Sequence, residues 1–352
     1  TSIDLRIQYL AYRELKSAIH EFRARAGSVV LLDVKTGEVL AMVNQPSFNP
    51  NDRSQFEVAR YRNRAATDIF EPGSTIKPFI VAAGLQSGKF RANSVIDTNP
   101  GFVKVGIKLI EDKHNLGAVD LSTILAKSSN VGMTHIALAL ERSEIWDTLT
   151  GLGFGQVTPA GFPGESAGLL SHHSHWRDIG VATLSYGYGM SATPLQLAQA
   201  YATLGAYGER RPLTFTRVDA PPAGERVFDA QVAKDVIHML ESVVTPDGTG
   251  IRAGVQGYRV AGKTGTAWKS HAGGYSTDKY MAVFAGVVPA TNPRLAAVVV
   301  IDEPSGGKFY GGEVAAPVFS AVVGGALRLL AVPPDDLSAV PSATLVQAVP
   351  AR

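Results

Sequence analysis

The chain has 352 residues, of which 45% are hydrophobic and 18% charged, and its formal net charge is +2. This composition is typical of a folded protein with a large core. It excludes a disordered chain, and no basic run supports nucleic-acid binding. The sequence contains no cysteine, which excludes disulfides, zinc-thiolate sites and a thiol nucleophile.

The beginning of the chain predicts a helix followed by a hairpin. Apolar residues at helical spacing predict an amphipathic helix over residues 4–25. Residues 28–34 and 38–43 are typical of strands, and Lys35-Thr36-Gly37 between them predicts the hairpin turn. The polar residues 49–68 then predict a surface loop.

The middle of the chain is predicted to be helix and loop. Pro72-Gly73 breaks the chain immediately before a predicted helix over residues 74–85. The clearest helical patterns after it lie at residues 121–140, 194–204 and 230–243. We expect these helices to form an insertion that makes a second lobe.

Strand patterns return near the end, at residues 258–264, 280–288 and 295–301, and a helix over 317–330 follows. The first hairpin should pair with these late strands, because it would otherwise leave two open edges. The predicted fold is α/β (α+β), with one antiparallel five-stranded sheet flanked by helices. The helical insertion covers about residues 80–250, and a cleft should lie between the two lobes.

The end of the chain gives no membrane-span signal. The most apolar run, residues 314–332, is interrupted by Pro317 and Arg328 and predicts a buried helix. The tail over residues 336–352 is predicted to be loose.

Short motifs of serine enzymes recur along the chain. Ser-x-x-Lys occurs at Ser74/Lys77, Ser276/Lys279 and Ser305/Lys308. Ser-x-Asn occurs at residues 47–49 and 128–130, and Lys-Thr-Gly at 35–37 and 263–265. Ser74 opens a predicted helix, which puts Lys77 one turn further on the same face. The pair at Ser276 precedes a strand, and the pair at Ser305 spans a Gly-Gly turn. Only the first pair therefore has a geometry suited to catalysis.

The chemistry of this pair calls for further groups. A serine hydroxyl needs a base, and a lysine amine can serve if burial and a second cation lower its pKa. Lys263 could supply that cation, Ser128 a hydroxyl for proton relay and Asn130 an amide for substrate. Taken alone, Ser128-Ser129-Asn130 is equally well interpreted as a kink or cap in the helix over 121–140.

In the order Ser-x-x-Lys, Ser-x-Asn, Lys-Thr-Gly, these motifs resemble the penicillin-binding proteins and serine β-lactamases. The wider phrases at residues 70–79, 127–132, 186–189 and 262–267 resemble class B penicillin-binding proteins of the septal, division-specific type 3. The resemblance runs from Ser2 to about Pro334, so residues 1–335 are expected to form a transpeptidase domain.

The resemblance implies a D,D-transpeptidase. Ser74 would attack the penultimate D-Ala of a stem peptide, Lys77 would take its proton, Ser128 would protonate the departing D-Ala and Lys263 would give electrostatic support. The N–H groups of Ser74 and Thr266 would form the oxyanion hole. The substrate-binding residues that it implies are Asn130, Tyr186, Tyr188, Thr264, Gly265, Thr266, Phe309 and Tyr310. No cofactor and no metal are expected.

The resemblance also implies a cellular setting. One N-terminal membrane helix and a pedestal domain would precede Thr1, and the catalytic domain would lie in the periplasm at the inner membrane. The implied partners are donor and acceptor stem peptides, β-lactams, a cognate glycosyltransferase and other division proteins, with no nucleic acid. Trp268 stands where the family usually has a basic residue, which leaves open whether this is a housekeeping or a specialised copy.

Other functions fit parts of the sequence. A D,D-carboxypeptidase or β-lactamase would use water as acceptor, but the chain lacks the Leu-Asn dipeptide of the class A deacylation motif. A β-lactam sensor would keep all three motifs, and the wide match to septal enzymes disfavours it. The Gly-x-Ser-x-Gly phrase around Ser166 lies among prolines and glycines and predicts a loop. His172, His173 and His175 predict a solvated loop and not a metal site.

Overall fold

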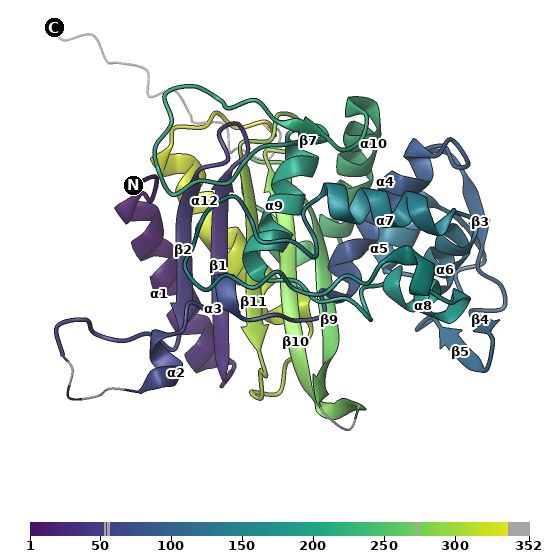
Figure 1. Ribbon diagram of the computed structural model, residues 1–352, viewed down its shortest axis with the longest axis horizontal. Coiled ribbons are helices and arrows are strands. Elements are labelled where there is room, and N and C mark those ends of the chain that lie inside the picture. The colour runs from purple at the N-terminus through teal and green to yellow at the C-terminus, as the bar shows by residue number, and fades with distance from the viewer. Residues whose placement is uncertain (53, 55–56, 272–273, 337–352) are drawn as a thin grey trace, which may run out of the picture.

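The structure is a computed structural model that describes residues 1–52, 54, 57–271 and 274–336. Its centre is an antiparallel sheet of five strands in the order β2-β1-β11-β10-β9 (Figure 1). The strands are β1 Ala26–Asp33, β2 Val39–Gln45, β9 Ala261–His271, β10 Gly274–Val288 and β11 Leu295–Asp302. The predicted fold class and the predicted five-stranded antiparallel sheet are confirmed, and three further two-stranded sheets were not predicted.

Strand β1 joins the first hairpin to the late strands, as predicted. It pairs with β2 on one side and with β11 on the other, where Val30 lies opposite Val298. All eight residues of β1 are buried, because helices cover both faces of the sheet. This double cover explains the continuous apolar runs of β1 and β11.

The hairpin of β9 and β10 is longer than predicted. The strand expected over 258–264 begins at Ala261 and continues to His271, and the strand expected over 280–288 already begins at Gly274. The extra length projects beyond the rest of the sheet (Figure 1). Residues there are polar and largely exposed, so they give no apolar strand pattern.

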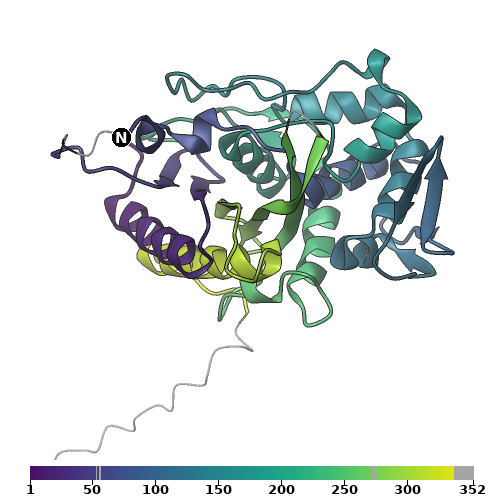
Figure 2. The same cartoon turned by 90° about the horizontal axis from the view of Figure 1, so that it is seen from below.

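Three predicted helices cover the sheet. α1 Leu5–Glu21 and α12 Ala316–Leu329 pack together on one face, and α9 Pro194–Gly205 crosses the other (Figures 1 and 2). Each face has its own apolar core, so the sheet separates two hydrophobic clusters. The sheet is therefore a rigid support for groups placed at its edge.

The edge of the sheet at β2 is covered. The Gln8 side chain of α1 donates to the Met42 carbonyl and accepts from the Met42 N–H, both at 2.9 Å. The Val39 N–H donates to the Thr214 carbonyl at 2.9 Å. These bonds satisfy backbone groups that an edge strand otherwise presents to solvent.

The helical lobe lies beside β9, at the other edge (Figures 1 and 2). Its helices are α4 Lys77–Gln86, α5 Leu121–Lys127, α6 Asn130–Leu138, α7 Arg142–Gly151, α8 Asp178–Leu184 and α10 Ala230–Glu241. The predicted helix over 121–140 is thus two helices, α5 and α6, with a break at Ser128. The domain extent over residues 1–335 stays a prediction.

Several short elements had no clear sequence signal. They are α2 Val58–Tyr61, α3 Arg64–Thr67, α11 Gly311–Val314, β3 Val95–Asp97, β4 Phe102–Val105, β5 Lys108–Glu111, β6 Ala118–Asp120, β7 Glu209–Arg210 and β8 Glu225–Arg226. The short strands pair as β3-β6, β4-β5 and β7-β8. No helix in the described part of the chain is both long and apolar enough to cross a membrane. The predicted tail lies outside the described residues, except for Asp336.

Candidate active site

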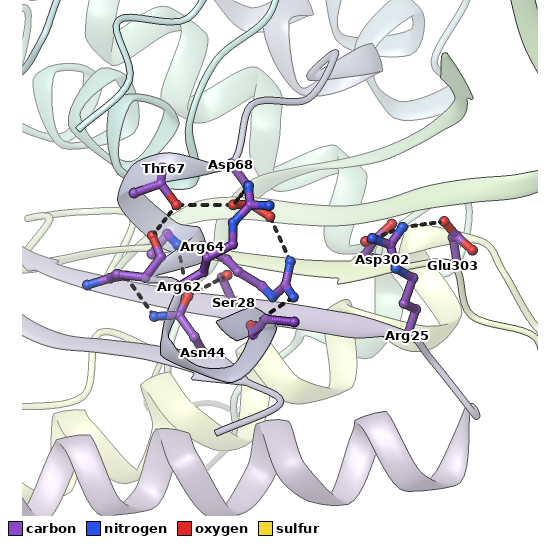
Figure 3. Close-up of polar contacts among 12 residues, drawn as sticks. Arg25, Ser28, Asn44, Arg62, Arg64, Thr67, Asp68, Asp302 and Glu303 are labelled. Carbon is purple, nitrogen blue, oxygen red and sulfur yellow. Dashed lines mark hydrogen bonds and ion pairs between the residues drawn. The ribbon is translucent and has the colours of Figure 1, made fainter. Parts of the chain in front are cut away.

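The segment leading to Ser74 is anchored by a polar cluster against the sheet (Figure 3). Asp68 accepts hydrogen bonds from Arg62, from Arg64 at 2.8 Å and from Thr67 at 3.1 Å. Arg64 is only 8% exposed. The predicted surface loop over 49–68 therefore ends in an ordered anchor for the nucleophile segment.

Ser74 lies in a 3-10 turn, Gly73–Ile76, that leads directly into α4 at Lys77. The predicted helix thus begins with a tighter turn. Tyr201 of α9 holds this turn in place, because its buried hydroxyl donates to the Thr75 carbonyl at 2.9 Å. The nucleophile is therefore tied both to α4 and to the helix that crosses the sheet.

Two glycines allow other segments to pack closely on this turn. A Cβ at Gly187, where φ is 88°, would lie 2.0 Å from the Gly73 carbonyl oxygen. A Cβ at Gly265 of β9 would lie 3.0 Å from the Pro72 carbonyl oxygen. Gly265, expected to admit substrate, thus makes room for the nucleophile turn itself.

Lys77 is 0% exposed and its amine is held by the break between α5 and α6. Nζ donates to the Ser128 carbonyl at 2.6 Å, to Asn130 Oδ1 at 2.8 Å and to Ser128 Oγ at 3.1 Å. Within the described residues, Ser74 Oγ has no hydrogen bond, so the hydroxyl is available to a substrate. The structure therefore brings Ser74, Lys77, Ser128 and Asn130 into one site.

Burial sets the charge state of the two lysines. It lowers the pKa of Lys77 well below its usual range, and the charge of Lys263 lowers it further, whereas Asp112 opposes the shift. Burial also lowers the pKa of Lys263 to about 7. A buried amine of this kind suits a general base near neutral pH.

The turn that holds Lys77 has a special backbone. Ser128 ends α5 in a left-handed conformation, with φ 59°, and Ser129 begins α6 as its N-cap, accepting from the Gly132 N–H at 2.8 Å. The predicted kink is therefore present, and it lies at the turn that holds Lys77.

Strand β9 forms the opposite wall. Thr264 Oγ1 is hydrogen-bonded to Thr249 Oγ1 at 2.7 Å, and Thr266 Oγ1 accepts from the Gly311 N–H at 3.0 Å. Both threonines line the same hollow as Ser74. Two hydroxyls at a strand edge can hold a carboxylate.

The outer N–H groups of β9 point toward the cleft. The Trp268 N–H donates to the Tyr188 hydroxyl at 3.3 Å and so faces away from β10. Residues two apart in a regular antiparallel ladder present their N–H groups to the same side, and 266–268 pair with β10 without a bulge. The Thr266 N–H therefore also faces the cleft.

The cleft consists of two adjoining hollows. The first, of ≈520 Å³, is lined by Ser74, Ser128, Asn130, Thr264 and Thr266 among others. The second, of ≈650 Å³, shares Asn130, Thr266 and Tyr310 with the first. Aromatic side chains line much of it: Tyr186, Tyr188, Trp268, Tyr275, Tyr280, Phe309 and Tyr310. A catalytic hollow thus opens into an aromatic groove.

Comparison with known proteins decides the family. The model of the penicillin binding protein transpeptidase domain matches residues 27–324. The chain belongs to this family. This transpeptidase domain is 50% identical over 337 residues to peptidoglycan D,D-transpeptidase FtsI of Escherichia coli strain K12. The matched region covers 96% of this chain and 57% of the relative. It is 42% identical over 341 residues to the probable peptidoglycan D,D-transpeptidase PbpC of Pseudomonas aeruginosa, across 97% and 60% of the two chains.

A solved structure agrees. The apo TP domain of Burkholderia pseudomallei penicillin-binding protein 3 matches with a TM-score of 0.87 and 44% identity, over 95% of this chain and 97% of that one. The predicted resemblance to the type 3 penicillin-binding proteins is confirmed. This transpeptidase domain spans less than two thirds of the curated relatives named above.

The competing motifs lie elsewhere in the transpeptidase domain. Ser276 hydrogen-bonds Asp278 on the exposed part of β10, and Ser305 donates to the Arg23 carbonyl at 2.8 Å. Lys35-Thr36-Gly37 is the predicted hairpin turn. Ser166 lies in a loop outside any helix or strand. None of these lines either hollow of the cleft.

The sequence did not single out Asp112, Thr249 or Tyr275, which also line the cleft. Asp112 follows a short, mostly exposed strand, and Thr249 lies in a loop before β9. Neither belongs to a motif or to a periodic pattern, so the fold alone brings them to the site.

Proposed function

We propose that this chain is the catalytic domain of a septal peptidoglycan D,D-transpeptidase that cross-links stem peptides through an acyl-enzyme on Ser74. The observation that carries the proposal is the Lys77 amine, which is fully buried and held by Ser128 and Asn130 one turn after Ser74. The names of the E. coli and P. aeruginosa relatives support the same reaction.

In the acylation step, Ser74 Oγ attacks the carbonyl carbon of the penultimate D-Ala while Lys77 Nζ accepts the hydroxyl proton. The negative charge then develops on the carbonyl oxygen, between the N–H groups of Ser74 and Thr266. The orientation of the Thr266 N–H toward the cleft supports this role. Burial, and after it the charge of Lys263, lower the pKa of Lys77, which leaves the amine free to take the proton.

The tetrahedral intermediate collapses when the peptide C–N bond breaks. The leaving D-Ala nitrogen takes a proton from the Ser128 hydroxyl, which regains one from Lys77. The 3.1 Å hydrogen bond between Lys77 Nζ and Ser128 Oγ supports such a relay. An amine of a neighbouring stem then attacks the ester carbonyl, loses its proton to the same relay and releases Ser74.

Substrate binding follows from the walls of the cleft. Thr264 and Thr266 would hold the terminal carboxylate, and Asn130 an amide of the stem. The aromatic groove with Tyr186, Tyr188, Phe309 and Tyr310 would cover the donor stem. Half of Trp268 is exposed there, so this chain offers an indole where the family usually has a cation.

The whole protein is proposed to work at the inner membrane. A single N-terminal helix and a pedestal domain before Thr1 would hold residues 1–335 in the periplasm at the septum. A cognate glycosyltransferase would supply glycan strands carrying the donor and acceptor stems. β-Lactams, which resemble D-Ala-D-Ala, would acylate Ser74, and no cofactor or nucleic acid is required.

Acylation by a fluorescent penicillin tests the nucleophile. We expect wild type to be labelled, with peptide mass spectrometry placing the adduct on Ser74. The Ser74→Ala variant should lose labelling with little change in thermal unfolding. Ser276→Ala, from another Ser-x-x-Lys pair, is the matched control and should label normally. An adduct on Ser276, Ser305 or Ser166 would exclude Ser74.

A second assay separates the transpeptidase from its alternatives. The chain is incubated with a pentapeptide ending in D-Ala-D-Ala and an amine acceptor, and products are identified by mass spectrometry. Cross-linked product supports the proposal. Tetrapeptide alone indicates a carboxypeptidase, and no turnover despite stable labelling indicates a sensor.

A further inference from the structure

Asp112 binds the start of α6 from a distant part of the chain. It lies between β5 and β6, yet its carboxylate accepts from the Ser129 hydroxyl, from the Asn130 N–H at 2.5 Å and from the Val131 N–H at 3.1 Å. These donors lie 17 to 19 residues further along the chain. A carboxylate fits them, because an ionised carboxylate is acceptor-only and has two oxygens.

The same residues hold the catalytic amine. Asn130 offers its N–H to Asp112 and its side-chain oxygen to Lys77, while Ser129 joins Asn130 to Ser128, which also binds Lys77. A displacement of the α6 start would thus displace the two residues, Ser128 and Asn130, that accept from Lys77. We propose that Asp112 is a positioning residue for acylation, holding the Ser128–Asn130 turn at the place where it binds Lys77. This inference rests on the proposed function of Lys77.

The position of Asp112 is itself fixed. Its N–H donates to the Gly101 carbonyl at 3.0 Å, which attaches it to the loop before β4. The Thr98 N–H donates to the Gly117 carbonyl at 2.8 Å and closes the β3–β6 pair around this loop. The small strands β3 to β6 therefore act as the mount that carries Asp112 to α6.

The charge of Asp112 adds a second effect. Two charged groups act on Lys77: Lys263 from β9 disfavours its ammonium form, and Asp112 favours it. Lys113, His114 and Lys127 are the other titratable groups besides Tyr310 that line the same hollow as Asp112. Removing the carboxylate charge should therefore lower the pKa of Lys77 and make the free amine available at lower pH.

Asp112→Asn tests the proposal, with Asp120→Asn as matched control. Asp120 caps α5 by accepting from the Thr123 N–H at 2.8 Å, but it is exposed and not among the charges that act on Lys77. The second-order rate of labelling by a fluorescent penicillin is measured against pH. We expect Asp112→Asn to lower the limiting rate about ten-fold or more, and to move the midpoint of the acidic limb to lower pH. Asp120→Asn should match wild type in both.

Asp112→Glu separates charge from geometry. It keeps the negative charge but moves it by one methylene, so the midpoint should stay near that of wild type while the limiting rate falls. The proposal is wrong if Asp112→Asn keeps the wild-type limiting rate and midpoint, or if Asp120→Asn changes them equally. If Asp112→Asn does not fold, the limiting rate of Asp112→Glu decides, and a wild-type limiting rate in that variant would contradict the proposal. Absence of labelling in wild type would instead contradict the proposed function.

Discussion

Replacing Lys263 by methionine should make the protein more stable and inactive. Lys263 is 0% exposed, and burial lowers its pKa from the usual 10.5 to about 7. A difference of roughly 3.5 pKa units between the unfolded and native states corresponds to a destabilisation on the order of 5 kcal/mol when the amine is charged. Methionine has a similar length and needs no hydration, so it fills the site without this destabilisation.

The pH dependence has a definite sign. Below about pH 7 both states carry the proton on Lys263, and the native state bears the full unfavourable burial of charge. Between about pH 7 and pH 10.5 the unfolded chain binds this proton and the native state does not, so stability rises with pH. The advantage of Lys263→Met should therefore be largest in acid and shrink toward alkaline pH.

Urea unfolding at about pH 6 and about pH 9.5 measures this difference. We expect the free energy of unfolding of Lys263→Met to exceed that of wild type by several kcal/mol at the lower pH and by much less at the higher pH. Penicillin labelling of this variant should be greatly slowed. Lys269→Met is the matched control on the same strand. Lys269 is paired with Asp302 at 2.6 Å and with Glu303 at 2.7 Å, so its loss should not stabilise. A Lys263→Met variant no more stable than wild type at the lower pH would refute the reasoning.

Three further outcomes follow from the cleft. Lys77→Ala should slow penicillin acylation by about 10²-fold or more, the scale of a lost general base, and stopped-flow labelling at wild-type rate would remove Lys77 from the mechanism. Gly187→Ala should lose both labelling and stability, because its Cβ would meet the Gly73 carbonyl. Gly189→Ala, at φ 80° with nothing within 4 Å, should retain labelling, and equal loss in both would point to backbone strain alone. The β-lactam acyl-enzyme should persist for hours by intact mass, because Asp112 is the one carboxylate among the described residues of the Ser74 hollow and already binds three donors. Turnover on the order of once per second would indicate a hydrolase.

The sheet could be predicted because its signals are strong and repeated. The apolar runs of β1 and β11 are continuous, and the turn at Gly37 fixes the first hairpin. The projecting ends of β9 and β10 could not be predicted, since pairing with each other and not burial maintains them. The small strands β3 to β6 could not be predicted either, because they are short and mostly exposed and so give no apolar pattern.

The candidate site divides in the same way. Ser74, Lys77, Ser128 and Asn130 occur in motifs whose order along the chain is specific although single copies recur. Asp112 has no such pattern, because its contact with α6 depends on how the β4–β5 hairpin and the β3–β6 pair fold. The packing of Gly265 against the nucleophile turn also needs the tertiary structure, since a glycine in a strand gives no sign of what approaches it.

The two edge strands of the sheet, β2 and β9, differ in whether their outer backbone groups already have hydrogen-bond partners. At β2 the backbone is sealed by Gln8 and by the Thr214 carbonyl. At β9 the Thr266 N–H faces the cleft, in the hollow that Thr266 lines together with Ser74 and Ser128. Under the proposed function, an extended stem peptide would pair with β9 as a sixth strand beside Ser74, whereas the backbone groups of β2 already have partners. In that case the main chain of β9 would favour extended peptides irrespective of their side chains.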